Sequence, residues 1–161
     1  MKKLKISYRP EIDGLRAIAI ASIVLYHAKI VFNNTDWFEG GFVGVDIFFV
    51  ISGYLITRII MNEIMMHGSF NFLNFYERRV RRILPMLFFV IFVSIPFAWH
   101  KLFPADFVNY SDSIIASIFF VSNFFFYFNG MEYGATNSLL LPLLHTWSLS
   151  IEFQFYLFYP L

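Results

Sequence analysis

The sequence FVGVDIFFVISGYLITRIIM, at positions 42–61, decides the fold of this chain. Only Asp46 and Arg58 are charged in this stretch, and most of the other residues are aliphatic or aromatic. A helix of about 20 residues is long enough to cross the hydrocarbon core of a bilayer, which is about 30 Å thick. The stretch therefore predicts a membrane-spanning helix.

The composition of the whole chain agrees with this prediction. Of the 161 residues, 58% are hydrophobic and 14% are charged, and a soluble domain of this size needs more charge to cover its surface. The absence of cysteine excludes disulfides, thiolate metal sites and cysteine nucleophiles. The histidines at positions 27, 67, 100 and 145 lack metal-ligand spacing, so we expect no metal site. Nucleic-acid binding has no support, because the one basic cluster lies between hydrophobic segments.

Four further hydrophobic segments accompany this stretch. We predict an all-α fold, a polytopic transmembrane helical bundle with spans at about 12–32, 42–61, 83–103, 113–129 and 143–161. Connections are expected at 33–41, 104–112 and 130–142, and a break at His67-Gly68-Ser69. Pro10 suits a helix start, and Pro96 can be tolerated inside the third span, with a kink. The last run reaches Leu161 without a cap, so we expect the chain to be part of a longer protein.

Lysine and arginine are unevenly distributed around the expected spans. They precede the first span (Lys2, Lys3, Lys5, Arg9) and lie between the cores of the second and third (Arg58, Arg78, Arg79, Arg81, Arg82). The connections at 33–41 and 104–112 contain acidic residues but no Lys or Arg. By the positive-inside rule, the amino terminus and the arginine cluster should be cytoplasmic and the two acidic connections outside.

Two ionisable residues lie in the first expected span. Arg16 and His27 are eleven residues apart, which places them on nearly the same helix face, about 16 Å apart along the axis. Charged groups at bilayer depth cost about 2.5–3.5 kcal/mol, so intramembrane ionisable residues are functional by default. The alternative is that this pair only holds helices together, with Arg16 near the cytoplasmic edge.

The second expected span contains Asp46 and Ser52 among apolar residues, and we treat both as candidates to line a cavity. Gly40, Gly41 and Gly44 would let another backbone or a substrate approach closely. The alternative for Asp46 is a carboxylate that pairs with an arginine or with a helix amino terminus.

The fifth expected span begins with three polar residues at i, i+3 and i+7. His145, Ser148 and Glu152 share one helix face at this spacing, which is typical of a cavity lining. Glu152 lies deepest. Trp147 and Tyr156 lie elsewhere on the helix and would pack or anchor in the membrane interface.

The arginine cluster at 78–82 allows two interpretations. Juxtamembrane arginines commonly anchor a protein to anionic lipid headgroups. Guanidinium groups also bind phosphates in bidentate fashion, which would make the cluster a phosphate clamp. On helical spacing, Arg78, Arg81 and Arg82 face one way and Arg79 faces another.

Four motifs in this order resemble the acyltransferase-3 family of membrane O-acyltransferases. They are YRPEIDGLRAIA at 8–19 with the Arg16–His27 spacing, GFVGVDIFFVISGYLI at 41–56, FYERRVRRILP at 75–85 and HTWSLSIEFQFY at 145–156. Members of that family have about ten spans, so five would be present here. Many also have a second glutamate directly after the position of Glu152, where this chain has Phe153.

The resemblance implies transfer of an acyl group, commonly acetyl from acetyl-CoA, to a hydroxyl of an exported glycan such as O-antigen or exopolysaccharide, in the inner (plasma) membrane. It implies catalytic roles for His27, Arg16 and Glu152, with His27 as general base or as a transient acyl carrier. The arginine cluster, Arg78, Arg79, Arg81 and Arg82, would bind the phosphates of the acyl-CoA co-substrate. Asp46, Ser52, His145 and Ser148 would line the cavity, and a thioester donor needs no metal cofactor.

A different class of function also fits the intramembrane charges. In a proton-coupled transporter, His27, Asp46 and Glu152 would form a proton relay. Broken helices would support this reading, but the sequence shows no paired Gly/Pro-interrupted spans. For either function we expect these 161 residues alone to be inactive, because half of the helices cannot wall a cavity.

Overall fold

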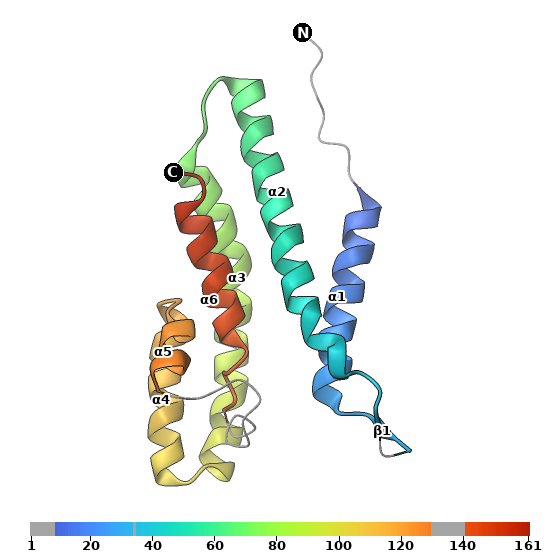
Figure 1. The fold of residues 1–161 in the computed structure, drawn as a ribbon. Helices are drawn as coiled ribbons and strands as arrows, with labels where there is room; N and C mark the ends of the chain where they lie inside the picture. The colour runs from blue at the N-terminus through green and yellow to red at the C-terminus, as the bar shows by residue number, and fades with distance from the viewer. Residues whose placement is uncertain (1–8, 34, 130–140) are drawn as a thin grey trace. The chain divides into compact units, whose positions relative to one another are not determined.

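The computed structural model describes residues 9–33, 35–129 and 141–161, and these are almost entirely helical (Figure 1). The chain divides into two compact units, Met1–Phe70 and Asn71–Leu161, and each is described by itself. Among the described residues, Glu39–His67 and Phe72–Lys101 are long and apolar enough to cross a membrane. The prediction of an all-α bundle with membrane-spanning helices is confirmed.

The first unit is a pair of helices joined by a small hairpin. Helix α1 (Pro10–Ala28) begins with a proline at its first position. Strand β1 (Val31–Phe32), at the end of the expected first span, pairs antiparallel with β2 (Thr35–Asp36) in the expected connection. A 3₁₀ turn (Glu39–Phe42) then leads into α2 (Val43–His67). Helix α2 ends at Gly68, which has a φ of 71°, so the predicted break at His67-Gly68-Ser69 is confirmed.

Two glycines bring α1 and α2 into backbone contact near the hairpin. A Cβ on Gly41 would lie 2.3 Å from the Ser22 carbonyl oxygen, and one on Gly44 would lie 2.4 Å from that of Ala19. Ala19 is completely buried in this contact. The prediction of a close approach is confirmed for these two glycines, whereas a Cβ on Gly40 would meet nothing within 4 Å.

The second unit is built on one long helix. Helix α3 (Phe72–Lys101) is capped by the Asn71 side chain, which accepts from the Asn74 amide at 3.0 Å. It includes the arginine cluster and continues through Pro85 and Pro96. Helices α4 (Pro104–Ile118), α5 (Ser122–Phe128) and α6 (Thr146–Phe158) complete the unit. Its buried core contains Leu87, Ile91, Ala98, Tyr110, Phe120 and Leu143.

The expectation of a connection at 104–112 is wrong, because this segment is the beginning of α4. Pro104 occupies the first turn, where its missing N–H costs nothing, and Asp106 complements the positive end of the helix. The expected single helix at 113–129 is wrong as well, because it is interrupted between α4 and α5. The polar residues at 104–112 therefore form the first turns of a helix and not a loop between two helices.

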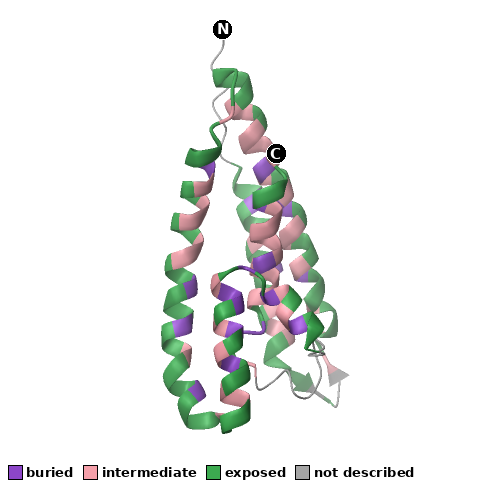
Figure 2. Ribbon diagram, turned by 90° about the vertical axis from the view of Figure 1, so that its left-hand side faces the viewer, coloured by how far each residue is buried: buried purple, intermediate pink, exposed green. Residues whose placement is uncertain are grey.

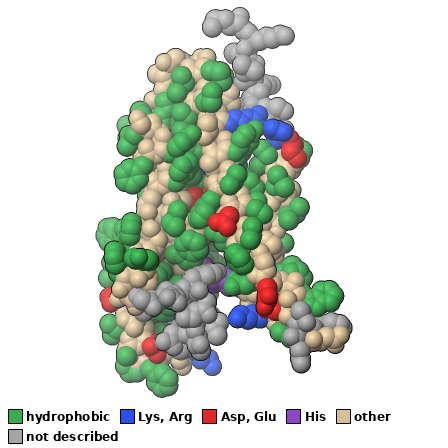
Figure 3. Space-filling view, viewed as in Figure 1, with side chains coloured by type: hydrophobic (Ala, Val, Ile, Leu, Met, Phe, Trp, Pro, Cys, Tyr) green, Lys and Arg blue, Asp and Glu red, His purple; other side chains and the backbone are tan. Residues whose placement is uncertain are grey.

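Most of the helix surface is apolar and exposed. Figure 2 shows exposed residues along much of α1 and α3, whereas α6 is exposed only at its carboxy-terminal end. The face in Figure 3 carries many hydrophobic side chains and few charges. Val50 on α2 and Phe92 on α3 are 73% and 68% exposed. Side chains of this kind are stable against lipid or further apolar helices, not against water.

A methyl group at Gly44 should separate α1 from α2. We expect Gly44→Ala to lower the unfolding free energy by about 1–3 kcal/mol, because the added Cβ collides with backbone that cannot move aside. Thermal unfolding of the full-length protein in detergent measures the effect. Gly40→Ala is the matched control, since its methyl group enters open space, and equal stability of the two variants would contradict the close contact.

Candidate functional site

Helix α6 has two different polar faces. Thr146, Ser150 and Gln154, at i, i+4 and i+8, face α4 and α5. His145, just before the helix, and Glu152 line a cavity on another side. The first face holds α6 in its unit, and the second is the candidate site.

The break between α4 and α5 is a Schellman motif with phenylalanine in the position usually taken by glycine. Phe120 has a φ of 54°, its amide donates to the Ser117 carbonyl at 3.1 Å, and the Val121 amide donates to the Ala116 carbonyl at 2.8 Å. A left-handed non-glycine residue costs about 1–2 kcal/mol. The Phe120 ring stacks on Phe153 of α6 with centroids 3.8 Å apart, which helps to offset that cost.

Hydrogen bonds from α6 stabilise this break. Gln154 Nε2 donates to the Phe120 carbonyl at 2.8 Å and to Asn123 Oδ1 at 2.9 Å. Hydroxyl groups continue the contact: Ser122 and Ser150 are 2.7 Å apart, Thr146 donates to Ser122 at 3.0 Å, and Ser117 lies 2.8 Å from Thr146. Inside an apolar bundle no water is available to these backbone and hydroxyl groups, so the hydrogen bonds to α6 avoid the free-energy cost of leaving them unpaired.

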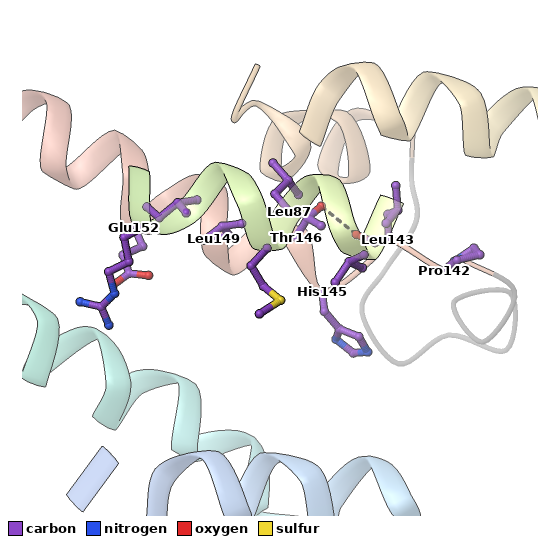
Figure 4. A pocket seen from close by; sticks show the side chains of 11 residues that line it. Leu87, Pro142, Leu143, His145, Thr146, Leu149 and Glu152 are labelled. Carbon is purple, nitrogen blue, oxygen red and sulfur yellow. Dashed lines mark hydrogen bonds between the residues drawn. The ribbon is translucent and has the colours of Figure 1, made fainter. Parts of the chain in front are cut away.

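The cavity lies between α3 and α6 and has a volume of about 420 Å³. Figure 4 shows Glu152 and His145 towards opposite ends of it, with Leu149 between them. Arg82 from α3 also lines it, and the remaining lining is mostly apolar: Ile83, Met86, Leu87, Val90, Pro142 and Leu143, with Thr146 near the His145 end. A mostly apolar cavity with a few convergent polar groups is typical of a small-molecule site.

Of the trio predicted on α6, the structure brings His145 and Glu152 to the cavity and leaves Ser148 out of its lining. The Ser148 hydroxyl donates to the His145 carbonyl at 3.0 Å. On α6 the cavity is lined by Leu149 and Glu152, with His145 just before the helix.

The arginine cluster divides as helical spacing predicts. Arg78, Arg81 and Arg82 are exposed on α3, and Arg81 pairs with Glu77 at 2.7 Å. Arg79 is half-buried, and its guanidinium carbon lies 5.3 Å from the ring centroids of both Phe75 and Tyr156. Arg82 is the member of the cluster that lines the cavity.

In the first unit, Arg16 and His27 both lie on the continuous helix α1. The Arg16 guanidinium carbon lies 5.4 Å from the Phe48 ring centroid on α2, an arrangement typical of a cation–π contact. His27 is exposed, and its Nδ1 lies 2.8 Å from the Ile23 carbonyl. Since a carbonyl can only accept, this contact requires a proton on Nδ1, which leaves Nε2 as the nitrogen that can act as a base.

The two candidates on α2 have different environments. Asp46 is exposed, in the first turn of the helix, and Ser52 is buried at 6% exposure. Six residues separate them, which places them on different sides of the helix. Neither lines the cavity between α3 and α6.

At the start of α1, Arg9 joins the beginning of the helix to α2. Its side chain pairs with Glu11 and donates to the Tyr54 hydroxyl at 3.1 Å. The Glu11 backbone amide and then Arg9 lower the pKa of the Glu11 carboxyl. Both residues precede the expected first span.

Sequence reasoning did not identify the structural roles of Thr146, Ser150, Gln154 and Tyr156. The first three recur every four residues, a spacing that could have revealed a second polar face. Tyr156 was assigned to packing or the interface, but its hydroxyl donates to the Glu152 carboxylate. Within the part of the chain that the structure describes, no group of three His, Cys, Asp or Glu side chains could hold a metal.

Comparisons with known proteins match nearly the whole chain. The family described as "Acyltransferase domain" matches residues 9–161. The peptidoglycan O-acetyltransferase OatA of Listeria monocytogenes is 42% identical over 155 residues, which cover 95% of this chain and 24% of that protein. O-acetyltransferase OatA of Staphylococcus aureus is 41% identical over 155 residues, covering 96% and 24%. The chain thus spans about a quarter of the length of these curated relatives. No solved structure matches it.

The Gln154 side chain should be essential to the stability of the broken segment. We expect Gln154→Leu to lower the unfolding free energy by about 1–3 kcal/mol, because the Phe120 carbonyl and the Asn123 side-chain amide lose a part-buried hydrogen-bond partner. Thermal unfolding in detergent measures this loss. Asn129→Leu is the control, since Asn129 is exposed and its side-chain amide donates to the Phe125 carbonyl one turn earlier, at 2.8 Å. An equal loss there would argue against a special role for Gln154.

Proposed function

The chain belongs to the acyltransferase family that matches residues 9–161, and on that premise we propose that the protein acetylates a cell-wall glycan. The donor is acyl-CoA, with acetyl as the transferred group, and the acceptor is a sugar hydroxyl. The protein lies in the plasma membrane with its amino terminus in the cytoplasm. The name of the Listeria relative favours peptidoglycan over lipopolysaccharide or exopolysaccharide as the acceptor.

The observation that carries the proposal is the cavity between α3 and α6. Its apolar walls suit the uncharged arm and acyl group of a thioester, and its polar groups, Arg82, His145 and Glu152, can contact the charged and reacting parts. The neighbouring exposed arginines, Arg78 and Arg81, add positive charge on the same helix. Guanidinium groups beside an apolar cavity are suited to a donor that is phosphorylated at one end and apolar at the other.

In the proposed reaction, the glycan hydroxyl oxygen attacks the thioester carbonyl carbon. A C–O bond forms, the C–S bond breaks, and the hydroxyl proton passes through a base to the departing thiolate. His27 has the chemistry for this base, because its Nδ1 proton is engaged by the Ile23 carbonyl and Nε2 carries the lone pair. The same lone pair could instead take the acyl group from the thioester and pass it to the hydroxyl in a second step.

The transporter alternative is less well supported by the local geometry. A broken helix does occur at Phe119–Val121, as transporters often have at their binding sites. However, the carbonyl of Phe120 is bonded to Gln154, and its ring is stacked on Phe153. Phe120, Phe153 and Gln154 do not line the cavity. The break is therefore a structural element of the unit and does not coordinate an ion or substrate in the cavity.

Replacement of His27 tests the proposed reaction. In the full-length protein, we expect His27→Ala to lower glycan acetylation by about 10²–10⁴-fold, the usual contribution of a positioned base. Mass spectrometry of the cell-wall glycan quantifies the acetyl groups. His67→Ala, at the exposed end of α2, is the control, and full activity in His27→Ala would remove His27 from the mechanism.

Arg82 tests the assignment of the donor site. We expect Arg82→Gln to raise the KM for acetyl-CoA by about 10–100-fold, as the loss of a charge-assisted hydrogen bond predicts. The increase should exceed that for Arg81→Gln, because Arg81 is paired with Glu77 and does not line the cavity. Lys101→Gln, at the other end of α3, controls for the loss of charge. An unchanged KM in Arg82→Gln would place the donor elsewhere.

A further inference from the structure

Arg79 differs from the other arginines of its cluster in what surrounds it. Its guanidinium carbon lies 5.3 Å from the ring centroids of Phe75, on its own helix, and of Tyr156, on α6. Phe75 and Tyr156 are buried, at 1% and 6% exposure. The Arg79 Nε atom is buried too and has no hydrogen-bond partner within the part of the chain that the structure describes. Two aromatic rings thus lie against the Arg79 guanidinium.

The ring beside Arg79 is connected to the cavity. The Tyr156 hydroxyl donates a hydrogen bond to the Glu152 carboxylate, one turn earlier on α6. Glu152 lines the cavity between α3 and α6. Arg79 therefore contacts the Tyr156 ring, and the hydroxyl of the same tyrosine contacts the Glu152 carboxylate.

A second contact fixes the register of the two helices at this point. Tyr76, next to Phe75 on α3, donates from its hydroxyl to the Leu157 carbonyl at 2.9 Å. Leu157 directly follows Tyr156, so α3 is bonded to α6 immediately beside the tyrosine that Arg79 contacts. The alignment of Arg79 with Tyr156 is thus supported independently of the arginine itself.

We propose that Arg79 is a positioning residue, which holds the Tyr156 ring so that the tyrosine hydroxyl fixes the Glu152 carboxylate at the cavity. This inference rests on the proposed function for its kinetic consequence, and it replaces the expected role of Arg79 as a ligand of donor phosphates. A guanidinium is suited to this role, because it is planar, permanently charged and weakly hydrated, and stacks readily on aromatic faces.

The kinetic test uses the full-length protein in membranes. We expect Arg79→Gln and Tyr156→Phe each to lower kcat by about 10–100-fold through misplacement of the carboxylate, with the KM for acetyl-CoA changed less than about twofold. The double variant should be no worse than the poorer single variant, because both changes interrupt one chain of contacts. Lys101→Gln, on the same helix, should retain the wild-type kcat.

An infrared measurement tests the positioning directly and needs no substrate. The carboxylate band of Glu152 is identified as the band that disappears in Glu152→Gln. It should shift in Tyr156→Phe, which removes the hydrogen bond and keeps the ring, and shift in the same direction in Arg79→Gln. If Arg79→Gln cannot be recovered in folded form, Phe75→Leu, which removes the other ring, should produce the shift instead.

The outcomes separate this inference from the proposed function. An increased KM with unchanged kcat in Arg79→Gln would overturn the inference and make Arg79 a donor ligand. A carboxylate band that stays unchanged in Arg79→Gln, or a loss of activity explained wholly by less folded protein, would also overturn it. Absence of acetyl transfer by the wild-type protein would count against the proposed function, and the infrared shifts would still decide whether Arg79 positions Glu152.

Discussion

The hydrogen bond from Gln154 to the Phe120 carbonyl joins α6 to the break between α4 and α5. A carbonyl that leaves its helix inside an apolar bundle has no water to replace the lost donor, so another side chain must supply one. Gln154 does this at 2.8 Å, and Thr146 and Ser150 add hydroxyl contacts along the same face of α6. Together these bonds fix the rotation of α6 about its axis.

The rotation of α6 determines which of its side chains face the cavity and which face α4 and α5. With Thr146, Ser150 and Gln154 directed at α4 and α5, Glu152 is left to line the cavity against α3. Tyr156, one turn further, then contacts Arg79. Rotation of α6 by one residue, about 100°, would break the polar contacts and remove the carboxylate from the cavity at the same time. Stability of the broken segment and geometry of the candidate site are therefore coupled.

The sequence predicted features whose physical cause is local. Gly41 and Gly44 predicted a close helix contact, because only glycine lacks a Cβ. Gly68 predicted a helix end, because glycine tolerates a positive φ. The division of the arginines followed from helical geometry alone. The break at Phe119–Val121 could not be predicted in this way, because phenylalanine carries no signal for the left-handed conformation. The conformation is set by a residue 34 positions away in the chain.

The sequence predicts that Tyr156 packs or anchors at the membrane interface, and its burial, at 6% exposure, confirms the packing. Its importance depends on Glu152, one turn earlier, and on Arg79, which belongs to a different helix. The spacing of four residues places Tyr156 beside Glu152 on α6, but the contact with Arg79 does not follow from spacing within one segment. Contacts between helices determine the geometry of the candidate site, whereas the sequence pattern describes each helix by itself.

Phe153 gives this geometry a chemical consequence. Its ring stacks on Phe120, so position 153 is directed at the broken turn, while position 152 is directed at the cavity. A carboxylate at 153 would lie against the Phe120 ring and could not share a substrate with Glu152. Within the part of the chain that the structure describes, Glu152 is the one carboxylate that lines this cavity. Tyr156, supported by Arg79, is placed to hold it in position.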